Sequence, residues 1–261
     1  MPDGDVTTDI IIPEKKQVTA IIQAVEKLTF AGYEIIPHCF GSTCQIHMYK
    51  SDGEVAEAGE ILGQINGPAK IILSSERVML NLVQKLCGIA SASQKYVQLA
   101  RSHDVKIFDT RKTTPGLRLF EKYAITVGGA YNHRLNLSEG ILIKDNHIRS
   151  AGSVTTAIQS AITSNTGLPL ELEVDNLNQV TEALKMQIDG FLLDNMSPSL
   201  IRKAVGLIRN SERGDEIFIE ASGGITDENI VSYLDTGINA ISVGAMTHSA
   251  ISKDIRLEFI S

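Results

Sequence analysis

The sequence predicts an α/β protein with two parts: a small N-terminal α+β module and a C-terminal parallel α/β barrel that is incomplete. From residue 105 onward, short apolar runs alternate with helical stretches, which is typical of βαβ units and a parallel sheet. There are six such runs, and no G-x-G-x-x-G dinucleotide-binding pattern accompanies them. These features favour an open barrel over a doubly wound sheet. Before residue 72 the apolar runs are short and separated by glycines, as in a small module of strands and turns.

The N-terminal module is expected to contain mostly strands and one helix. Residues 9–12 are apolar and β-branched, and residues 45–49 alternate, so both segments are predicted strands. Residues 18–31 have a mixed pattern that ends at Gly32. Residues 50–55 indicate a turn followed by a strand.

A long helix is predicted to follow, from Ser74 to about Arg101. The hydroxyl of Ser74 and the acid at Glu76 are typical of a helix start. Gly88 lies inside this helix, where it costs about 1 kcal/mol relative to Ala unless close packing requires it. Arg77 falls in the first turn, where the helix dipole disfavours a cation, so the residues alone favour an exposed arginine. The apolar stripe of the helix consists of Val78, Leu82, Val83, Leu86 and Ala90.

The barrel begins after this helix. We expect a domain boundary between residues 103 and 104, with the tail 250–261 joining the first domain, so that the barrel spans 104–249. Its predicted strands are 105–109, 141–144, 170–175, 190–194, 217–221 and 239–243. Its predicted helices are 117–127, 154–163, 177–186, 198–209 and 227–236.

Composition limits the classes of protein that fit. The 261 residues are 43% hydrophobic and 21% charged, as in ordinary globular proteins. The net charge of −7 argues against a nucleic-acid partner, and no apolar run is long enough for a membrane span. The segment 1–5 has neither a basic start nor an apolar stretch, so we expect no signal peptide. Three cysteines cannot all pair, and a reducing cytoplasm is the expected location.

Residues 109–147 form a basic island in this acidic chain. From 111 to 144 there are six Lys or Arg residues and two acids, interleaved with Gly, Thr and Asn. Such an island suggests a local site for an anion. A solvated basic face is the alternative reading.

Polar residues stand at the predicted strand ends, where the chemistry of parallel barrels is located. Cations follow the first two strands at Arg111, Lys112 and Lys144, and acids end the third and fourth at Glu173 and Asp194. The last two strands are followed by the glycine-containing segments Ser222-Gly223-Gly224 and Val243-Gly244. Glycines there let backbone N–H groups approach an anion, so a phosphate site is expected on these two loops.

The chemistry implied is a two-part pocket. One end takes a phosphate, and the other offers Arg111, Lys112, His133, Arg134 and Lys144 to further anionic groups, because arginine suits carboxylates. The remaining acids, Glu173 and Asp194, fit Mg²⁺ binding together with substrate phosphates, or the stabilisation of a developing positive charge. No Ser-His-Asp order or Cys-His pair suggests a covalent nucleophile.

A second cluster, of His38, Cys39, Cys44 and His47, has residue types that suit zinc. The spacing contains no repeated C-x-x-C knuckle, and His38 and Cys39 would point to opposite faces of a strand. Buried thiols and strand histidines are the preferred reading.

Long, ordered motifs resemble those of the quinolinate phosphoribosyltransferases, also called carboxylating nicotinate-nucleotide pyrophosphorylases. The resemblance covers nearly the whole chain, including Gly4–Thr8 near its start and Glu76-Arg77 in the long helix. The motifs that carry it are Asp109–Arg118, Glu121–Ala124, Gly128-Gly129, Asn132–Arg134, Leu142–Ile148, Leu193–Asn195, Ser222–Gly224 and Val243–His248.

The resemblance implies conversion of quinolinate and phosphoribosyl pyrophosphate into nicotinate mononucleotide, pyrophosphate and CO₂, with Mg²⁺, in de novo NAD synthesis. It implies an N-terminal α/β sandwich and a C-terminal open TIM-like barrel. It also implies a homodimer, or a multiple of one such as a hexamer, with Arg77 reaching into the neighbouring subunit's site. The residues matched to substrate binding are Arg77, Thr110, Arg111, Lys112, His133, Arg134, Lys144, Glu173, Asp194, Ser222, Gly223, Gly224, Val243 and Gly244.

Within that set the resemblance assigns roles. Arg111, His133, Arg134 and Lys144 match the quinolinate-binding residues, and Lys112 matches a lysine between quinolinate and pyrophosphate. Glu173 and Asp194 match acids near the ribose and metal. Lys112, Lys144, Glu173 and Asp194 are the expected catalytic residues, and Lys144 and Lys112 are candidates for protonating the carbanion left by decarboxylation.

The sequence departs from the family pattern at two places, and two alternative functions are considered. The family usually has a helix before the Gly-Asp-x-Thr-Thr segment, which begins here at Gly4, and Ala130 replaces a frequent third glycine after Gly128-Gly129. The rivals are a molybdenum-transport-associated relative and a phosphate-ligand-binding barrel without catalysis. The intact Lys144–His147 motif argues against the first rival, and the filled catalytic-type positions argue against the second.

Overall fold

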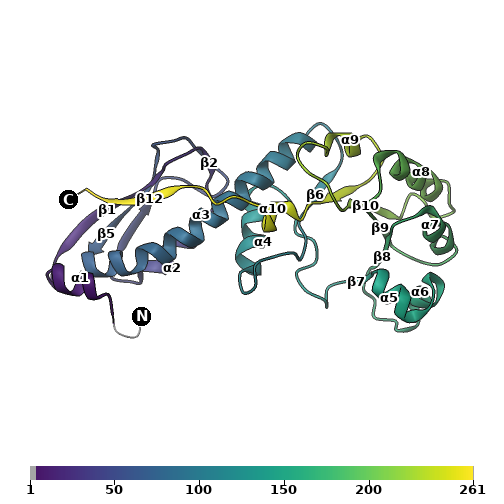
Figure 1. Ribbon diagram of the computed structural model, residues 1–261, viewed down its shortest axis with the longest axis horizontal. Helices are drawn as coiled ribbons and strands as arrows, with labels where there is room; N and C mark the ends of the chain where they lie inside the picture. Colours follow the sequence, from purple (N-terminus) through teal and green to yellow (C-terminus); the bar gives the residue numbers. More distant parts are fainter. Residues whose placement is uncertain (1–3, 261) are drawn as a thin grey trace. The chain divides into compact units, whose positions relative to one another are not determined.

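The computed structural model describes residues 4–260 and divides into two compact units, which we treat separately (Figure 1). The first unit contains the described residues up to Gln94, Thr114–Gly129 and those from Ser249 on. The second contains Lys95–Thr113 and Ala130–His248. We predicted no signal peptide from residues 1–5. Residues 1–3 of that segment lie outside the described residues.

The first unit is built on a four-stranded antiparallel sheet in the order β12-β1-β5-β3. Alternate residues of β1 are buried from Val18 to Ala24, so one face of the sheet packs into a core. Two further strands, β2 and β4, form a small ribbon. The strands are β1 (Gln17–Ala24), β2 (Leu28–Thr29), β3 (Gln45–Met48), β4 (Val55–Ala56), β5 (Ile61–Pro68) and β12 (Ile255–Phe259). The tail pairs with β1 through β12.

The helices of this unit are α1 (Val6–Ile11), α2 (Ile36–Phe40), α4 (Arg118–Val127) and most of α3 (Ala69–Ala100). Glu121 of α4 is fully buried and pairs with Lys85 of α3 at 3.1 Å. Gly128 follows α4, and a Cβ there would lie 2.4 Å from the carbonyl oxygen of Ala90 on α3. Because α4 packs so closely on α3, residues 114–129 belong to the first unit, although they lie beyond the boundary expected after residue 103.

Three predictions for this unit were wrong. Residues 9–12 were expected as a strand, but α1 forms because Asp5 caps it, accepting a hydrogen bond from the Thr8 N–H at 3.1 Å. The long helix begins at Ala69 rather than Ser74, whose hydroxyl donates to the Ile71 carbonyl inside the helix. His38 and Cys39 lie in α2 rather than in a strand.

Gly88 of α3 is explained by the tail. A Cβ at this position would lie 2.2 Å from the carbonyl oxygen of Ile251, so only glycine lets the tail backbone pass here.

The second unit is a six-stranded parallel sheet in the order β6-β11-β10-β9-β8-β7, so the first of these strands pairs with the last. The strands are β6 (Lys106–Phe108), β7 (Ile141–Ile143), β8 (Leu170–Val174), β9 (Gly190–Asp194), β10 (Phe218–Ser222) and β11 (Ala240–Ser242). Within residues 4–260 nothing pairs β6 directly with β7, so the barrel is open there. The predicted open TIM-like barrel is thereby confirmed.

Helices follow most strands of the barrel (Figure 1). They are α5 (Asp145–Ala151), α6 (Val154–Thr163), α7 (Leu177–Ala183), α8 (Pro198–Arg209), α9 (Val231–Leu234) and α10 (Ala245–His248). Three begin at side-chain N-caps, provided by Ser153, Asn176 and Ser197. The helix expected over 227–236 is shorter because Asn229 folds the preceding segment into turns, accepting from Thr226 N and donating to Gly224 O.

The gap beside β6 is filled by the segment after Gly129. Tyr131 N donates to Ile107 O at 2.8 Å, and Asp109 N donates to Tyr131 O at 3.0 Å. This short parallel pairing directs the following residues, Asn132 to Arg134, along the end of β6.

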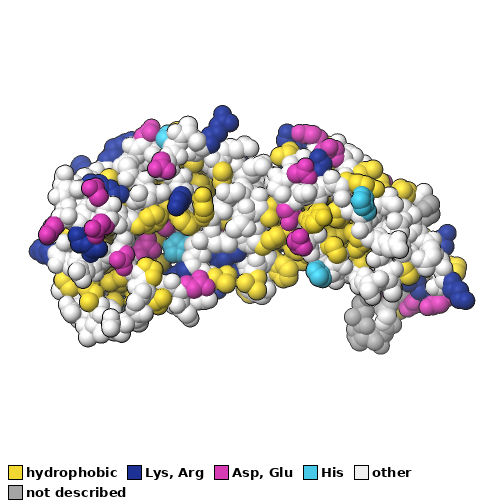
Figure 2. Space-filling view, turned by 180° about the vertical axis from the view of Figure 1, so that it is seen from behind, with side chains coloured by type: hydrophobic (Ala, Val, Ile, Leu, Met, Phe, Trp, Pro, Cys, Tyr) yellow, Lys and Arg dark blue, Asp and Glu magenta, His cyan; other side chains and the backbone are white. Residues whose placement is uncertain are grey.

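The surface carries charged side chains of both signs. On the face in Figure 2, basic and acidic side chains are interspersed rather than gathered by sign. Among residues 4–260, no helix is both long and apolar enough to cross a membrane.

Candidate active site

A cavity of about 470 Å³ opens at the carboxyl ends of the barrel strands, and all of its lining belongs to the second unit. Every strand of the sheet contributes at or next to its carboxyl end, which is where barrel enzymes carry out chemistry. The lining residues are Asp109, Thr110, Arg111, Lys112, His133, Arg134, Leu142, Lys144, Glu173, Leu192, Asp194, Asn195, Glu220, Ser222, Gly223, Gly224 and Ser242.

One end of the cavity gathers cations. The Arg134 side chain donates to the Gly140 carbonyl at 2.9 Å. Partial burial and the nearby charge of Arg111 lower the pKa of Arg134, so these two guanidinium groups repel each other. An anion placed between them would relieve that repulsion, which makes this end of the cavity suited to a carboxylate.

Lys144 stands at the same end, directly after β7 and at the N-terminus of α5. Its ammonium group pairs with the carboxylate of Glu173 at the end of β8. The Lys144 N–H donates to Nδ1 of His147 at 2.9 Å, which fixes the backbone from which the lysine projects. A lysine and an acid therefore face the cavity as a pair, and the lysine remains partly exposed to a ligand.

The loop after β6 is held from two sides. Asp109 is fully buried and accepts a hydrogen bond from the His133 N–H at 2.8 Å, which joins this loop to the segment that carries Arg134. The Lys112 carbonyl accepts from the Thr247 hydroxyl at 2.8 Å. Arg111 and Lys112 therefore project from a loop anchored at both ends, which limits the conformational entropy lost when an anion binds.

The opposite end of the cavity is a glycine turn. Gly223 and Gly224 have φ values of +87° and +63°, which L side chains rarely adopt. A Cβ at Gly223 would lie 2.3 Å from Oδ1 of Asn195. Asn195 also has a positive φ, and its amide group donates to Asp194 at 2.6 Å. Successive left-handed residues present backbone N–H groups in a concave arrangement that suits a phosphate.

Helix dipoles contribute little beside this turn. Gly244 is followed at once by α10, but α10 has only four residues, and the four-residue α9 begins at Val231, well after Gly224. A full helix dipole requires more turns than these provide. The backbone amides rather than a helix must therefore supply the positive potential.

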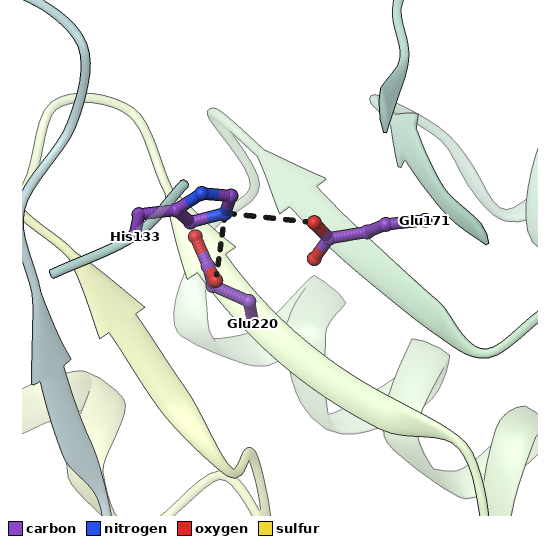
Figure 3. A group of neighbouring side chains, drawn as sticks. All are labelled: His133, Glu171 and Glu220. Carbon is purple, nitrogen blue, oxygen red and sulfur yellow. Dashed lines mark ion pairs between the residues drawn. The ribbon is translucent and has the colours of Figure 1, made fainter. Parts of the chain in front are cut away.

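Beneath the cations, three ionisable side chains meet in the barrel: His133, Glu171 of β8 and Glu220 of β10 (Figure 3). Nε2 of His133 lies 3.6 Å from a carboxylate oxygen of each acid. Burial raises the pKa of Glu220 to about 7, and the charge of Glu171 adds to this. Burial lowers the pKa of His133, but the hydrogen bond to Glu171 and the charges of both acids outweigh it, so this pKa is raised.

The structure brings together eleven of the fourteen predicted binding residues in the cavity. Val243 is buried, and Gly244 lies against the cavity loop, since a Cβ there would meet Lys112 at 3.3 Å. Arg77 is exposed on α3 in the first unit.

Sequence reasoning missed several residues of this site. Glu220, Ser242 and Asn195 line the cavity, and Glu171 approaches His133, but none was predicted as a site residue. Glu220 carried a usable signal: it is an acid inside an otherwise apolar strand, on the same face as Ser222 because side chains alternate.

Comparison with known proteins identifies the relatives of the chain. Residues 5–87 match the model of the quinolinate phosphoribosyl transferase N-terminal domain, and residues 89–258 match that of the C-terminal domain. A probable carboxylating nicotinate-nucleotide pyrophosphorylase of Bacillus subtilis is 40% identical over 98% of this chain and 88% of its own length. The carboxylating nicotinate-nucleotide pyrophosphorylase of Mycobacterium leprae is 37% identical over 97% and 90%.

Solved structures agree with these relatives. A nicotinate-nucleotide pyrophosphorylase from Ehrlichia chaffeensis superposes with a TM-score of 0.93 at 37% identity, covering 99% of this chain and 93% of that one. A NadC deletion mutant superposes with a TM-score of 0.94 at 37% identity, covering 99% and 91%.

Proposed function

We propose a function for the cavity on the premise that the chain belongs to the quinolinate phosphoribosyl transferase family. The chain is a carboxylating nicotinate-nucleotide pyrophosphorylase: quinolinate and phosphoribosyl pyrophosphate give nicotinate mononucleotide, pyrophosphate and CO₂ in NAD biosynthesis. The observation that carries the proposal is the division of one cavity into a cationic end and a glycine turn. Quinolinate has two carboxylates and phosphoribosyl pyrophosphate has phosphates, so the two ends match the two substrates.

The cationic end binds quinolinate in this proposal. Arg111, Arg134 and Lys144 hold its carboxylates, supported by their convergence on one end of the cavity. The mutual repulsion of the two arginines is relieved by the dianion, which favours a dicarboxylate over a monocarboxylate. His133 lies beside them, and Thr110 and Lys112 extend the same loop toward the pyrophosphate.

The glycine turn binds the 5′-phosphate of the ribose. Ser222, Gly223 and Gly224 contribute backbone N–H groups, and Val243 with Gly244 closes the cradle. The positive φ of Gly223 and its tight fit against Asn195 support this role, because only glycine allows the turn that presents these N–H groups.

The reaction then follows from orientation and charge. With its carboxylates held by cations, quinolinate directs its ring nitrogen at the anomeric carbon, the new C–N bond forms and pyrophosphate leaves. The transition state has oxocarbenium character, which the carboxylates of Glu173 and Asp194 stabilise. The ring nitrogen becomes cationic, so the electron pair of the adjacent C–COO⁻ bond stays on the ring as CO₂ departs. A proton from Lys144 or Lys112 completes the product.

Mg²⁺ is the proposed cofactor. Glu173 and Asp194 end neighbouring strands, β8 and β9, and both line the cavity, so their oxygen donors fit a hard cation shared with substrate phosphates. When bound, Mg²⁺ neutralises charge on the leaving pyrophosphate. The pairing of Glu173 with Lys144 holds this carboxylate at the cavity wall before any ion arrives.

The proposed assembly is a homodimer, or a multiple of one such as a hexamer, in the cytoplasm. Arg77 supports this assignment, because it is an arginine exposed on α3 in an acidic chain. In the dimer Arg77 reaches the partner subunit's cavity and adds a cation to its quinolinate end.

Turnover with quinolinate, phosphoribosyl pyrophosphate and Mg²⁺ tests the proposal. We expect nicotinate mononucleotide to form and nicotinate to be inert in place of quinolinate. Tight binding of phosphoribosyl pyrophosphate without product would instead indicate a catalytically inactive binding barrel. Turnover of nicotinate would contradict the dicarboxylate assignment.

A further inference from the structure

His133, Glu171 and Glu220 meet at the cationic end of the cavity, and neither acid has a role in the reaction as described above (Figure 3). Both acids come from barrel strands, whereas His133 comes from the segment that fills the gap beside β6. The contacts of the imidazole ring determine what this group does.

The ring has a defined tautomer. Nδ1 of His133 accepts a hydrogen bond from the Arg134 backbone N–H at 2.8 Å. A backbone N–H can only donate, so Nδ1 carries a lone pair and the ring proton is on Nε2. Nε2 faces Glu171 and Glu220, which can only accept when ionised. The two carboxylates favour a second ring proton, but a proton on Nδ1 would break the contact with Arg134, so the observed contacts are those of the neutral ring.

Both ring nitrogens are therefore used within the protein. Nε2 faces the carboxylates of Glu171 and Glu220, and Nδ1 accepts a hydrogen bond from the backbone N–H of Arg134. The Arg134 side chain is held in turn by the Gly140 carbonyl at 2.9 Å. The ring therefore fixes the backbone from which this cavity cation projects.

Of the two acids that face the ring, Glu220 is the more firmly held. Its side chain is 2% exposed, and one oxygen accepts a hydrogen bond from the hydroxyl of Ser242 on the neighbouring strand β11, while the other faces His133 Nε2. Glu171 is less constrained, because its Oε1 is buried and accepts no hydrogen bond from the described residues. The carboxylate of Glu220 is therefore the fixed end of a chain that runs through His133 to Arg134.

We infer that Glu220 is a positioning residue for quinolinate binding, which acts by holding His133 in its Nε2–H tautomer and so fixing Arg134. The inference takes quinolinate as the substrate from the proposed function. The tautomer of His133 is independent of that proposal. The role differs from that of Lys144 or Arg111, because Glu220 would repel a carboxylate rather than bind it.

Two substitutions separate this role from simple packing. Glu220→Gln keeps one oxygen facing Nε2–H, while its amide can donate to Ser242. Glu220→Met fills a similar volume and offers no oxygen to Nε2–H. We expect Glu220→Met to raise the KM for quinolinate at least about tenfold, and the KM for phosphoribosyl pyrophosphate less than about twofold. Glu220→Gln should recover most of the loss.

The control is Glu216→Gln, which removes an exposed acid two residues before β10 that pairs only with Arg213 among the described residues. Its KM for both substrates should match that of the wild type. Thermal unfolding of each variant shows whether the barrel is intact.

The tautomer is measured directly by ¹⁵N NMR of the imidazoles in the full chain, with His133→Asn used to assign the signal. We expect Nδ1 of His133 to be unprotonated and Nε2 protonated in the wild type and in Glu220→Gln. A proton on Nδ1 in the wild type would overturn the inference even if Glu220→Met did not fold. An unchanged quinolinate KM in folded Glu220→Met would also overturn it. If the wild type makes no CO₂ but shows the expected tautomer, the proposed function fails and the positioning contact stands.

Discussion

At the residue scale, the proposed acid-binding end of the cavity depends on a few cations held by nearby contacts. Arg111 and Arg134 lie close enough to lower the pKa of Arg134, and Lys144 is paired with Glu173. The site therefore contains unfavourable cation repulsion that a dianionic ligand relieves, which is a physical reason for preferring two carboxylates to one.

Removing Arg134 should affect one substrate only. Arg134→Ala eliminates a charge-assisted hydrogen bond, worth about 1.5–3 kcal/mol, to a carboxylate. We expect the KM for quinolinate to rise roughly 10- to 150-fold, with the KM for phosphoribosyl pyrophosphate nearly unchanged. Steady-state kinetics with each substrate varied in turn measure both values, and equal effects on the two would count against the assigned role.

Glu220 should make stability depend on pH. Its pKa is about 7 in the folded chain, above the ordinary value of 4.5, because burial and Glu171 disfavour its charge while His133, Ser242 and Lys144 only partly compensate. The unfolded carboxyl loses its proton first, so the free energy of unfolding should fall as pH rises from about 4.5 to about 7. Urea unfolding of the wild type and of Glu220→Gln tests this: the decline should be smaller in the variant, and equal declines would argue against a raised pKa.

At the element scale, turns rather than helices form the proposed phosphate end. The sequence pattern placed glycines after β10 and β11 correctly, but it predicted a ten-residue helix where Asn229 folds turns and only Val231–Leu234 is helical. Side-chain capping of loops by Asn and Asp competes with helix formation, and periodicity cannot detect it. The same limit explains the missed helix α1, whose start is set by Asp5.

Gly223 should be intolerant of any side chain. In Gly223→Ala the new Cβ would clash with Asn195 and the φ of +87° would be strained. We expect the KM for phosphoribosyl pyrophosphate to rise at least about tenfold, with a smaller change for quinolinate. Gly206→Ala is the matched control, because Gly206 lies in α8 with nothing within 4 Å of a new Cβ. Normal kinetics in Gly223→Ala would remove the phosphate cradle from the proposal.

At the scale of the whole molecule, the sequence predicted the barrel well because its strands are apolar, short and regularly spaced, which is a local signal. It also located most of the cavity, since the carboxyl ends of parallel strands meet at one edge. Tertiary contacts were harder to predict. Nothing local shows that α4 packs on α3, that the 131–134 segment fills the gap beside β6, or that Glu171 and Glu220 meet at His133.

The proposed homodimer gives a test that mixes two variants with weakened quinolinate binding, assayed at low quinolinate. Arg77→Ala and Arg134→Ala should each lower activity, because each removes a cation from every site. After dissociation and reassociation in equal amounts, half of the dimers contain one chain of each kind, and one of their two sites has both arginines. About a quarter of the wild-type activity should return. No recovery, with mixed dimers verified by native mass spectrometry, would place Arg77 outside the partner subunit's site.

The central claim is that one cavity joins a dicarboxylate to a ribose phosphate and then removes one carboxylate. The direct measurement uses quinolinate labelled with ¹⁴C in either its 2- or its 3-carboxyl group, together with phosphoribosyl pyrophosphate and Mg²⁺. We predict that the 2-carboxyl label appears entirely as CO₂, equimolar with nicotinate mononucleotide, while the 3-carboxyl label stays in the nucleotide. Release of the 3-carboxyl label, or CO₂ release without phosphoribosyl pyrophosphate, would contradict the account.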